Sequence, residues 1–429
     1  MIKQTNNLVT KPDFRRQRVS IGQWLVMIGL FLTAFSLPLL DWRFFIQGLE
    51  FNISDFLILS TAVIYFIDRL LSYLRGQSTK AWRWPLGWPI AIFLIIILLS
   101  SAFSPWPLPA LKYSLRVIVF AYIFYLALPF NALDSWQKWR WPLAGVIIAG
   151  GYSSIIGLLS LKWQDLNDAF FRVQPMAIFG RWWMGSNHNL LAEFLVISNF
   201  FLIAWGRLNK DKYQYYRILD ILFIISSITA LLTFSRAAWI VIAVQLIIWW
   251  ASLDSHRNQT NWLIALFLLI VLAFPLWWKM DSLQTANYSS TENRVLLTDI
   301  AWKGLKQKPI LGWGSGQFLQ LVDDNLRFRA KYGDPIDSHG VLQKVAAENG
   351  SLGLMALLVL FISLLLIWWR AWLSNPKSRP WLTPLILGAA GGLFFQLFNT
   401  SYYKGKVWLP VAISLAAIRL LAYEKKKKQ

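Results

Sequence analysis

The sequence contains no cysteine, which excludes structural disulfides, thiolate metal sites and thiol catalysis but leaves the cellular compartment open. Histidine is scarce as well, with three copies, so each can be considered separately as a catalytic candidate. Acidic residues number 21 against 42 basic residues, and the formal net charge is +21. The basic residues stand in short groups between apolar segments, a pattern typical of membrane topology, so we expect no nucleic-acid partner.

Long apolar runs dominate the rest of the chain. Hydrophobic residues make up 56% of the 429 positions and the mean hydropathy is +0.46, which exceeds what a soluble core needs. Much of the apolar surface must therefore face lipid. The runs predict an all-α, polytopic membrane protein with about twelve transmembrane helices. They fall near residues 22–41, 54–71, 86–103, 113–130, 142–161, 189–205, 217–233, 237–252, 262–278, 352–372, 382–400 and 406–422.

The basic residues between these runs predict the orientation of the chain. With the N-terminus inside, the inward segments carry most of the lysine and arginine, as in 69–83, 207–217 and 425–428, whereas the short outward loops carry few. This asymmetry favours cytoplasmic termini. The basic start leads into an apolar run too long for a signal peptide, so we expect the first span to be retained.

One polar segment, residues 280–350, interrupts the pattern of short loops and falls on the outer side. We therefore divide the chain into 1–279 with spans one to nine, 280–350 as an outer catalytic loop, and 351–429 with spans ten to twelve and a basic cytoplasmic tail. The loop predicts a helix over 293–306, a turn at Gly312, Gly314 and Gly316, a helix over 317–329, and a helix from an N-cap at Ser338 to Gly350.

Two features of this loop resemble ligand sites but are better explained otherwise. The glycine run 312–316 lacks the G-x-x-x-x-G-K-[ST] form and the preceding buried strand of a phosphate loop, so we interpret it as a turn. The adjacent carboxylates Asp323 and Asp324 point about 100° apart on a helix and have no evident third ligand. We expect a solvated face there and no metal site.

The arginines on the outer side, where the topology rule disfavours positive charge, include Arg181, Arg236 and Arg294. Snorkelling, or pairing with a loop carboxylate such as Glu292, would explain any one of them. A shared anionic ligand is the functional alternative. Pyrophosphate fits, because guanidinium groups bind its oxygens through two parallel hydrogen bonds and stay charged.

The histidines differ in their surroundings. His256 stands in a predicted cytoplasmic loop among polar residues and is expected to be solvated, whereas His188 begins the sixth span, where interfacial packing is as good an explanation as function. His339 falls in the first turn of the predicted third loop helix. The positive end of the helix dipole disfavours imidazolium there and favours a neutral imidazole that can accept a proton.

Four stretches between about residues 180 and 355 carry recognisable motifs: 189–192 after Gly185, 233–239 with the sequence Thr-Phe-Ser-Arg-Ala-Ala-Trp, 293–314 with Asn-Arg, Trp302 and Pro-Ile-Leu-Gly-Trp-Gly, and 339–353. Together they resemble the O-antigen ligases and the related O-antigen polymerases, which share a long outer loop late in the chain. The last is the most specific, since His339, Gly350 and Gly353 fit the family spacing. Gly340 departs from it, standing where the family has a polar residue, and Ser338 or Asp337 would have to substitute.

The resemblance implies an inverting, metal-independent glycosyl transfer without a cofactor. The donor would be an undecaprenyl-pyrophosphate-linked glycan, and the acceptor a hydroxyl of the lipid A core or of another glycan, at the periplasmic side of a bacterial plasma (inner) membrane. His339 would be the general base, with Arg236 and Arg294 as the other catalytic residues. The implied substrate-binding residues are Arg181, Asn189 and Ser338, and Glu348 is structural or faces the substrate. Ligase and polymerase share these motifs, so a surface-polysaccharide polymerase is the alternative.

Two other classes of protein compete with this interpretation. A metal-dependent membrane glycosyltransferase would use an acid in its first outer loop, where Asp41 stands, but the second acidic motif that such enzymes need is not apparent. A transporter or flippase would place charges near the middle of its spans, whereas this chain keeps its charges at the span ends.

Overall fold

The computed structural model describes residues 19–428, apart from 42, 47–48, 79, 165–170, 209–212 and 253–279. Within these residues, seven helical segments are long and apolar enough, by length and composition, to cross a membrane. They are α2 (Ile53–Leu74); Pro107–Ala132, made of α4 (Pro107–Arg116), the π-helical η1 (Val117–Ala127) and α5 (Leu128–Ala132); α6 (Trp136–Leu159) with η2 (Ser160–Trp163); α7 (His188–Leu208); α14 (Val341–Ser374); η4 (Pro376–Ser378), α15 (Arg379–Phe395) and η5 (Gln396–Phe398); and α16 (Gly405–Lys428).

Four shorter apolar helices accompany them: α1 (Ile21–Ser36), α3 (Gly87–Ala102), the apolar part of α8 (Tyr213–Leu232) and α9 (Arg236–Ala251). The protein is thus a mostly helical, multi-pass membrane protein, as its hydropathy predicts. The count of twelve spans stays a prediction. The predicted span 262–278 and His256 lie outside the residues that the structure describes.

A short β-hairpin, which the sequence analysis did not predict, is a local exception to the helical fold. Strands β1 (Arg43–Ile46) and β2 (Leu49–Asn52) pair antiparallel, with Arg43 opposite Asn52 and Ile46 opposite Leu49. The segment is rich in phenylalanine, which favours strands. Phe44 and Phe51 both pack against Phe56 of α2, so tertiary contacts with the bundle also stabilise the hairpin.

The helices form a bundle around α7, α15 and α16, which are largely buried, while α2 and α14 expose most of their apolar surface to the outside. Small residues bring the central helices close together, because a Cβ at Gly388 of α15 would lie 2.4 Å from the ring of Phe201 in α7. Tryptophan also contributes to this interior. The Trp139 and Trp381 side chains are fully buried, and Trp368 is nearly so.

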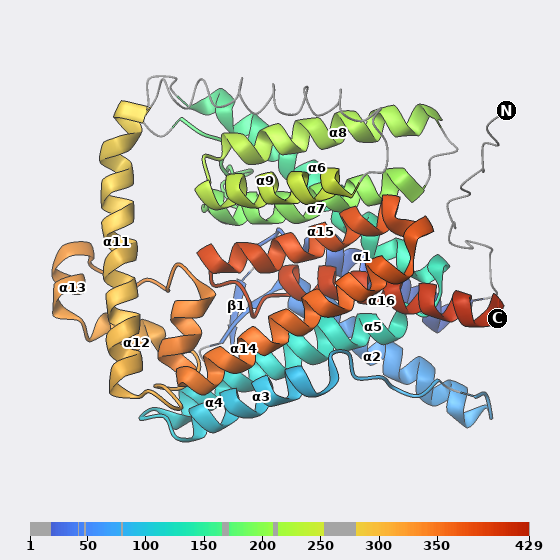
Figure 1. Cartoon of the computed structure of the whole chain (residues 1–429), viewed down its shortest axis with the longest axis horizontal. Coiled ribbons are helices and arrows are strands. Elements are labelled where there is room, and N and C mark those ends of the chain that lie inside the picture. The colour runs from blue at the N-terminus through green and yellow to red at the C-terminus, as the bar shows by residue number, and fades with distance from the viewer. Residues whose placement is uncertain are drawn as a thin grey trace.

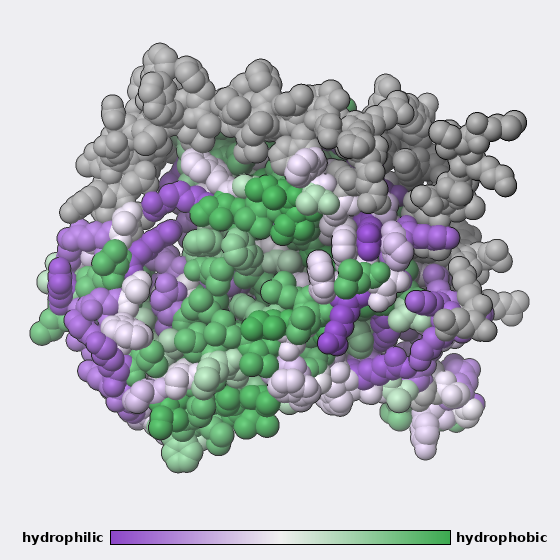
Figure 2. Space-filling model, in the orientation of Figure 1, coloured by the Kyte–Doolittle hydropathy of each residue, from purple (hydrophilic) through white to green (hydrophobic). Residues whose placement is uncertain are grey.

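The two ends of the bundle differ in character. The C-terminus lies at one end, and α11 (Met280–Gln307), α12 (Phe318–Asp323) and α13 (Leu326–Tyr332) lie at the opposite end (Figure 1). At the C-terminal end, Lys80 pairs with Asp134 at 2.8 Å and Arg419 donates to the Leu133 carbonyl at 3.1 Å. The inward segment 69–83 and the C-terminal part of α16 therefore both contact the connection between α5 and α6. An apolar band separates the polar ends (Figure 2).

The predicted loop helices are present with different boundaries. The first lies within α11, which begins earlier, at Met280. The second is divided into α12 and α13, because the Asn325 side chain accepts a hydrogen bond from the backbone N–H of Phe328 and starts a new helix. The third begins at Val341, so the prediction of Ser338 as its N-cap is wrong. The Ser338 hydroxyl instead bonds the backbone of Gly340, and His339 precedes the helix.

Candidate active site

The loop is fastened to the bundle by a break in α14 at Gly350, whose backbone is non-helical with φ 65° and ψ −166°. Around this break the glycine segment, residues 309–316, pairs with the helix backbone. Trp313 and Gly314 donate to the carbonyls of Ala347 and Glu348 at 3.1 and 2.7 Å, and Ser351 and Leu352 donate to those of Pro309 and Ile310 at 2.8 and 3.3 Å. The predicted turn at Gly312, Gly314 and Gly316 is confirmed, since all three have positive φ.

Glu348 belongs to this fastening. Its side chain is fully buried, and its carboxylate accepts a hydrogen bond from the backbone N–H of Phe318 at 3.0 Å, at the start of α12. A Cβ at Gly312 would lie 2.4 Å from the backbone carbon of Glu348, so the glycine segment packs directly on the helix. Of the two roles that the sequence leaves open for Glu348, the contacts support the structural one. The consequence is a fixed position of α11 relative to the start of α14.

That position brings four distant elements to one place, centred on Arg294 of α11. The guanidinium of Arg294 interacts electrostatically with Arg236 at the start of α9, with His188 at the start of α7 and with His339 just before α14. The three predicted catalytic residues, His339, Arg236 and Arg294, therefore lie together although more than a hundred positions separate the first from the second. We call Arg236, Arg294, His188 and His339 the Arg–His cluster.

The cations of this cluster have no neutralising carboxylate within the described part of the chain. Burial, together with the nearby charge of Arg236, lowers the pKa of Arg294. The Arg294 Nε is buried and has no hydrogen-bond partner among these residues. Arg236 is exposed. Two cations in this arrangement favour a polyvalent anion as the missing partner.

His339 is half-buried, and its pKa lies below the ordinary value of 6.5. Burial lowers the pKa most, the charge of Arg294 lowers it further, and Asp337 partly opposes both. The imidazole is therefore neutral at neutral pH, as the sequence predicts, but for a different reason. His339 does not lie in the first turn of the helix, because Gly340 is the N-cap and α14 begins at Val341.

The predicted substrate-binding residues do not all lie at the Arg–His cluster. Asn189 is the second residue of α7, next to His188, and its backbone N–H bonds the Asn187 side chain at 2.8 Å. Arg181 is exposed in a two-residue bridge with Ile178, and the electrostatic contacts of the Arg–His cluster do not include it. Ser338 is buried with its hydroxyl on the Gly340 carbonyl at 3.1 Å, which leaves it engaged with its own segment.

Gly340, which stands where the family has a polar residue, lies in a place with little room for a side chain. A Cβ at this position would lie 2.8 Å from the Leu397 carbonyl oxygen, so a larger residue would force the segment to shift. Ser338 and Asp337 supply polar contacts here, since the Asp337 carboxylate accepts a hydrogen bond from the Ser338 backbone N–H at 2.8 Å. They thus order the segment in place of a polar side chain at 340.

Sequence reasoning missed Arg172. Its Nη1 lies 3.4 Å from His188 Nε2, and both Arg172 and Arg294 act electrostatically on His188. The backbone N–H and carbonyl of Arg172 are both held by the Gln164 side chain, at 3.1 and 2.9 Å, and Val173 donates to the Leu232 carbonyl at 2.9 Å. One signal in the sequence could have pointed to Arg172, because it is another arginine in a predicted outward loop, but no motif surrounds it.

The adjacent carboxylates Asp323 and Asp324 do not share a partner. Asp323 pairs with Arg329 at 2.7 Å, whereas Asp324 accepts a hydrogen bond from Gln320 at 3.0 Å, so the two carboxylates have separate partners as expected for a solvated face. In the part of the chain that the structure covers, no three His, Cys, Asp or Glu side chains are placed to hold a metal ion.

Comparison with known proteins supplies a family for this region. Among curated proteins, none matches the chain by sequence. A family model described as O-Antigen ligase matches residues 221–358, which contain Arg236, Arg294, the glycine segment and His339. The matched part therefore holds every predicted catalytic residue together with the break in α14 that fixes their arrangement. Residues 221–358 of this chain are therefore similar to the O-antigen ligase family, which supports assigning this region to it.

Proposed function

We propose that the protein is a glycosyltransferase of the O-antigen ligase type, which moves a glycan from undecaprenyl pyrophosphate to a hydroxyl of the lipid A core at the periplasmic face of the inner membrane. One observation carries the proposal. Arg294 lies close both to Arg236 and to the half-buried imidazole of His339, and neither arginine has a carboxylate partner among the described residues. This combination suits a reaction between a lipid-linked pyrophosphate and a hydroxyl group.

The donor's pyrophosphate is proposed to bind Arg236 and Arg294, with its polyprenyl tail in the bilayer beside the exposed apolar helices. Arg172, held next to His188, extends the positive surface on the side of α7. Asn189 and Arg181 are proposed to contact the donor further from the reacting bond. Ser338 is proposed to act indirectly, because its hydroxyl is bonded to its own segment.

In the reaction, the acceptor oxygen attacks the anomeric carbon from the face opposite the pyrophosphate. A new carbon–oxygen bond forms while the bond from the anomeric carbon to the pyrophosphate oxygen breaks, and its electron pair leaves with the pyrophosphate. The imidazole of His339 accepts the proton of the acceptor hydroxyl. The arginines stabilise the negative charge that grows on the leaving group. Pyrophosphate is a good leaving group, so no nucleotide or general acid is required.

The test is His339→Ala in purified protein, with a synthetic undecaprenyl-pyrophosphate-linked oligosaccharide as donor and lipid A core as acceptor. Loss of a positioned general base should lower turnover by about 10²- to 10⁴-fold, while donor affinity and melting temperature stay close to wild type. The matched control is His256→Ala, which removes a histidine assigned by sequence to a cytoplasmic loop. If His339→Ala keeps more than about a tenth of wild-type turnover, His339 is not the base.

Ligase and polymerase differ in product, so deletion of the gene distinguishes them. Loss of all long chains from the lipid anchor, with carrier-linked polymer accumulating, identifies a ligase. A surface glycan reduced to a single repeat identifies a polymerase, which is the alternative within the same family.

A further inference from the structure

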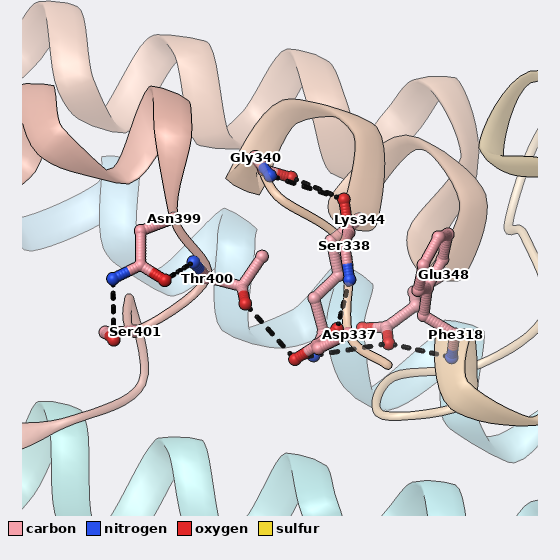
Figure 3. Close-up of polar contacts among 9 residues, drawn as sticks. All are labelled: Phe318, Asp337, Ser338, Gly340, Lys344, Glu348, Asn399, Thr400 and Ser401. Carbon is pink, nitrogen blue, oxygen red and sulfur yellow. Dashed lines mark hydrogen bonds and ion pairs between the residues drawn. The ribbon is translucent and has the colours of Figure 1, made fainter. Parts of the chain in front are cut away.

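The short segment that carries His339, residues 337–340, is held by the side chain of Asp337. One carboxylate oxygen of Asp337 accepts a hydrogen bond from the Ser338 backbone N–H at 2.8 Å. The other pairs with the Lys344 ammonium at 2.6 Å and accepts a hydrogen bond from the Thr400 hydroxyl at 3.2 Å (Figure 3). The segment is therefore fixed both to the first turns of α14 and to the connection between α15 and α16.

Lys344 is a costly residue to bury. Its side chain is 4% exposed, and its ammonium lies between Asp337 and the fully buried Glu348, which is 3.9 Å away. The rings of Tyr113 and Tyr403 lie 5.5 and 5.8 Å from the ammonium. A buried ion pair of this kind generally gives no more stability than apolar side chains of the same volume. Its presence beside His339 therefore calls for a role other than stability.

A second buried ion pair lies on the far side of Thr400. The carboxylate of Glu193, in α7, pairs with Lys406 at 2.6 Å and accepts a hydrogen bond from the Asn399 side chain at 2.7 Å. The side-chain amide oxygen Oδ1 of Asn399 in turn accepts a hydrogen bond from the Thr400 backbone N–H at 2.8 Å. Polar contacts thus run from Lys344 through Asp337, Thr400 and Asn399 to Glu193.

Two residues of this series of contacts, Glu193 and Asp337, are near members of the Arg–His cluster in sequence. Glu193 lies about one helical turn beyond Asn189 on α7, the helix that begins with His188. Asp337 lies two positions before His339. Three residues of this series of polar contacts, Glu193, Asn399 and Thr400, lie outside the matched residues 221–358. The site thus depends on parts of the protein on both sides of that stretch.

We infer that the Asp337–Lys344 and Glu193–Lys406 ion pairs, joined by Asn399 and Thr400, form a positioning network that sets His339 at its working distance from the cluster arginines. The inference rests on the proposed role of His339 as base. These residues are positioning residues, since they act through the 337–340 segment. A shift of about 1 Å in a reacting group can lower turnover about 10²-fold, so the network should affect kcat more than donor binding.

The test compares Asp337→Asn, Lys344→Met and the double variant in purified protein with the synthetic undecaprenyl-pyrophosphate-linked donor. Each single variant removes one charge of the Asp337–Lys344 pair and should melt at a lower temperature. The double variant removes both charges of that pair and should recover part of the loss, although the buried Glu348 carboxylate still lacks the Lys344 ammonium 3.9 Å away. Turnover should not recover with it. The double variant is expected to keep a kcat lowered by about 10- to 100-fold and a donor KM close to wild type.

Thr400 provides an independent variant of matched size. Thr400→Val removes the hydroxyl that bonds Asp337 and should lower kcat, while Thr400→Ser keeps the hydroxyl and should restore most of it. The control is Asp134→Asn, which removes a carboxylate paired with Lys80 and Lys138 at the opposite end of the bundle and should keep wild-type kcat.

Two outcomes overturn the inference. One is a double variant, Asp337→Asn with Lys344→Met, that turns over like wild type. The other is a loss of kcat that follows melting temperature across all variants, because that pattern indicates a purely structural network. His339→Ala is assayed in parallel. If it is inactive while the double variant is fully active, only the network fails; if His339→Ala is itself active, the proposed function of His339 fails.

Discussion

Gly350→Ala is expected to be among the most damaging small substitutions in the loop. Backbone at φ 65° and ψ −166° is accessible essentially to glycine, and another residue there costs about 1–3 kcal/mol. The new Cβ would also lie 2.2 Å from the Ile310 carbonyl oxygen, so the glycine segment must move away. Losing the Ser351–Pro309 and Leu352–Ile310 hydrogen bonds at about 1 kcal/mol each brings the expected loss of stability to about 4 kcal/mol.

Gly333→Ala is the matched control for this experiment. Gly333, at the end of α13, has φ 77° and ψ −120°, yet a Cβ there would meet nothing within 4 Å. It therefore measures backbone strain alone. The two variants should differ by about 2 kcal/mol, the two hydrogen bonds that only Gly350→Ala disrupts.

The assay is thermal unfolding in detergent, followed by intrinsic tryptophan fluorescence, together with donor affinity. Gly350→Ala should melt lower than Gly333→Ala and should also bind donor more weakly, because the glycine segment sets the position of α11 and hence of Arg294. Equal melting temperatures for the two variants, with unchanged donor affinity, would refute the argument that the glycine segment fixes the site.

Four further predictions concern the site and its membrane orientation. Arg236→Lys and Arg294→Lys should lose most activity although charge is kept, since lysine cannot make two parallel contacts with pyrophosphate; full activity in both removes the pyrophosphate site. EDTA should not inhibit the purified enzyme, and inhibition that magnesium or manganese restores would favour metal-dependent chemistry. Turnover should fall on acidification only below pH 6.5, because the pKa of His339 is lowered from that value. Arg294→Gln should raise the pKa of His339 by removing a charge that lowers it, which NMR titration of the imidazole measures without turnover; an unchanged pKa contradicts the coupling. A single cysteine at position 324 should react with an impermeant reagent in intact cells and one at position 427 should not; the reverse result overturns the orientation.

The helices of the bundle could be predicted from the sequence, because each one is marked by residues close together along the chain. Apolar runs and basic loops mark the spans residue by residue, and the described helices agree with eleven of the twelve predicted positions. The loop helices were less predictable at their ends. Ser338 is a favourable N-cap residue by type, yet its hydroxyl bonds Gly340 and the helix starts three residues later.

The hairpin at 43–52 shows a different limit. Its strands are four residues each, too short for a periodic signal, and stacking on Phe56 of the neighbouring helix contributes to its stability. Such contacts depend on which helices and strands pack together in the fold, so the sequence of the hairpin alone does not reveal them.

The candidate site contains some residues that sequence motifs mark and others whose roles depend on tertiary contacts. His339, Arg236 and Arg294 could be selected because motifs surround them, and the resemblance to a family identified those motifs. Arg172 and the partners of Asp337 could not, since their roles depend on contacts such as Thr400 with Asp337, which are 63 positions apart in sequence. A buried lysine such as Lys344 looks like any helix-surface residue until its partners are known.

The crowding of Arg236 and Arg294 also has a consequence for the empty enzyme. Each guanidinium opposes the charge of the other, as the lowered pKa of Arg294 reflects after its burial, and no described carboxylate relieves the repulsion. The unliganded protein therefore carries an electrostatic penalty that a bound pyrophosphate would cancel. Neutral substitution of either arginine should raise the melting temperature of the empty protein while abolishing its stabilisation by donor, so this enzyme would trade resting stability for affinity at the same two residues.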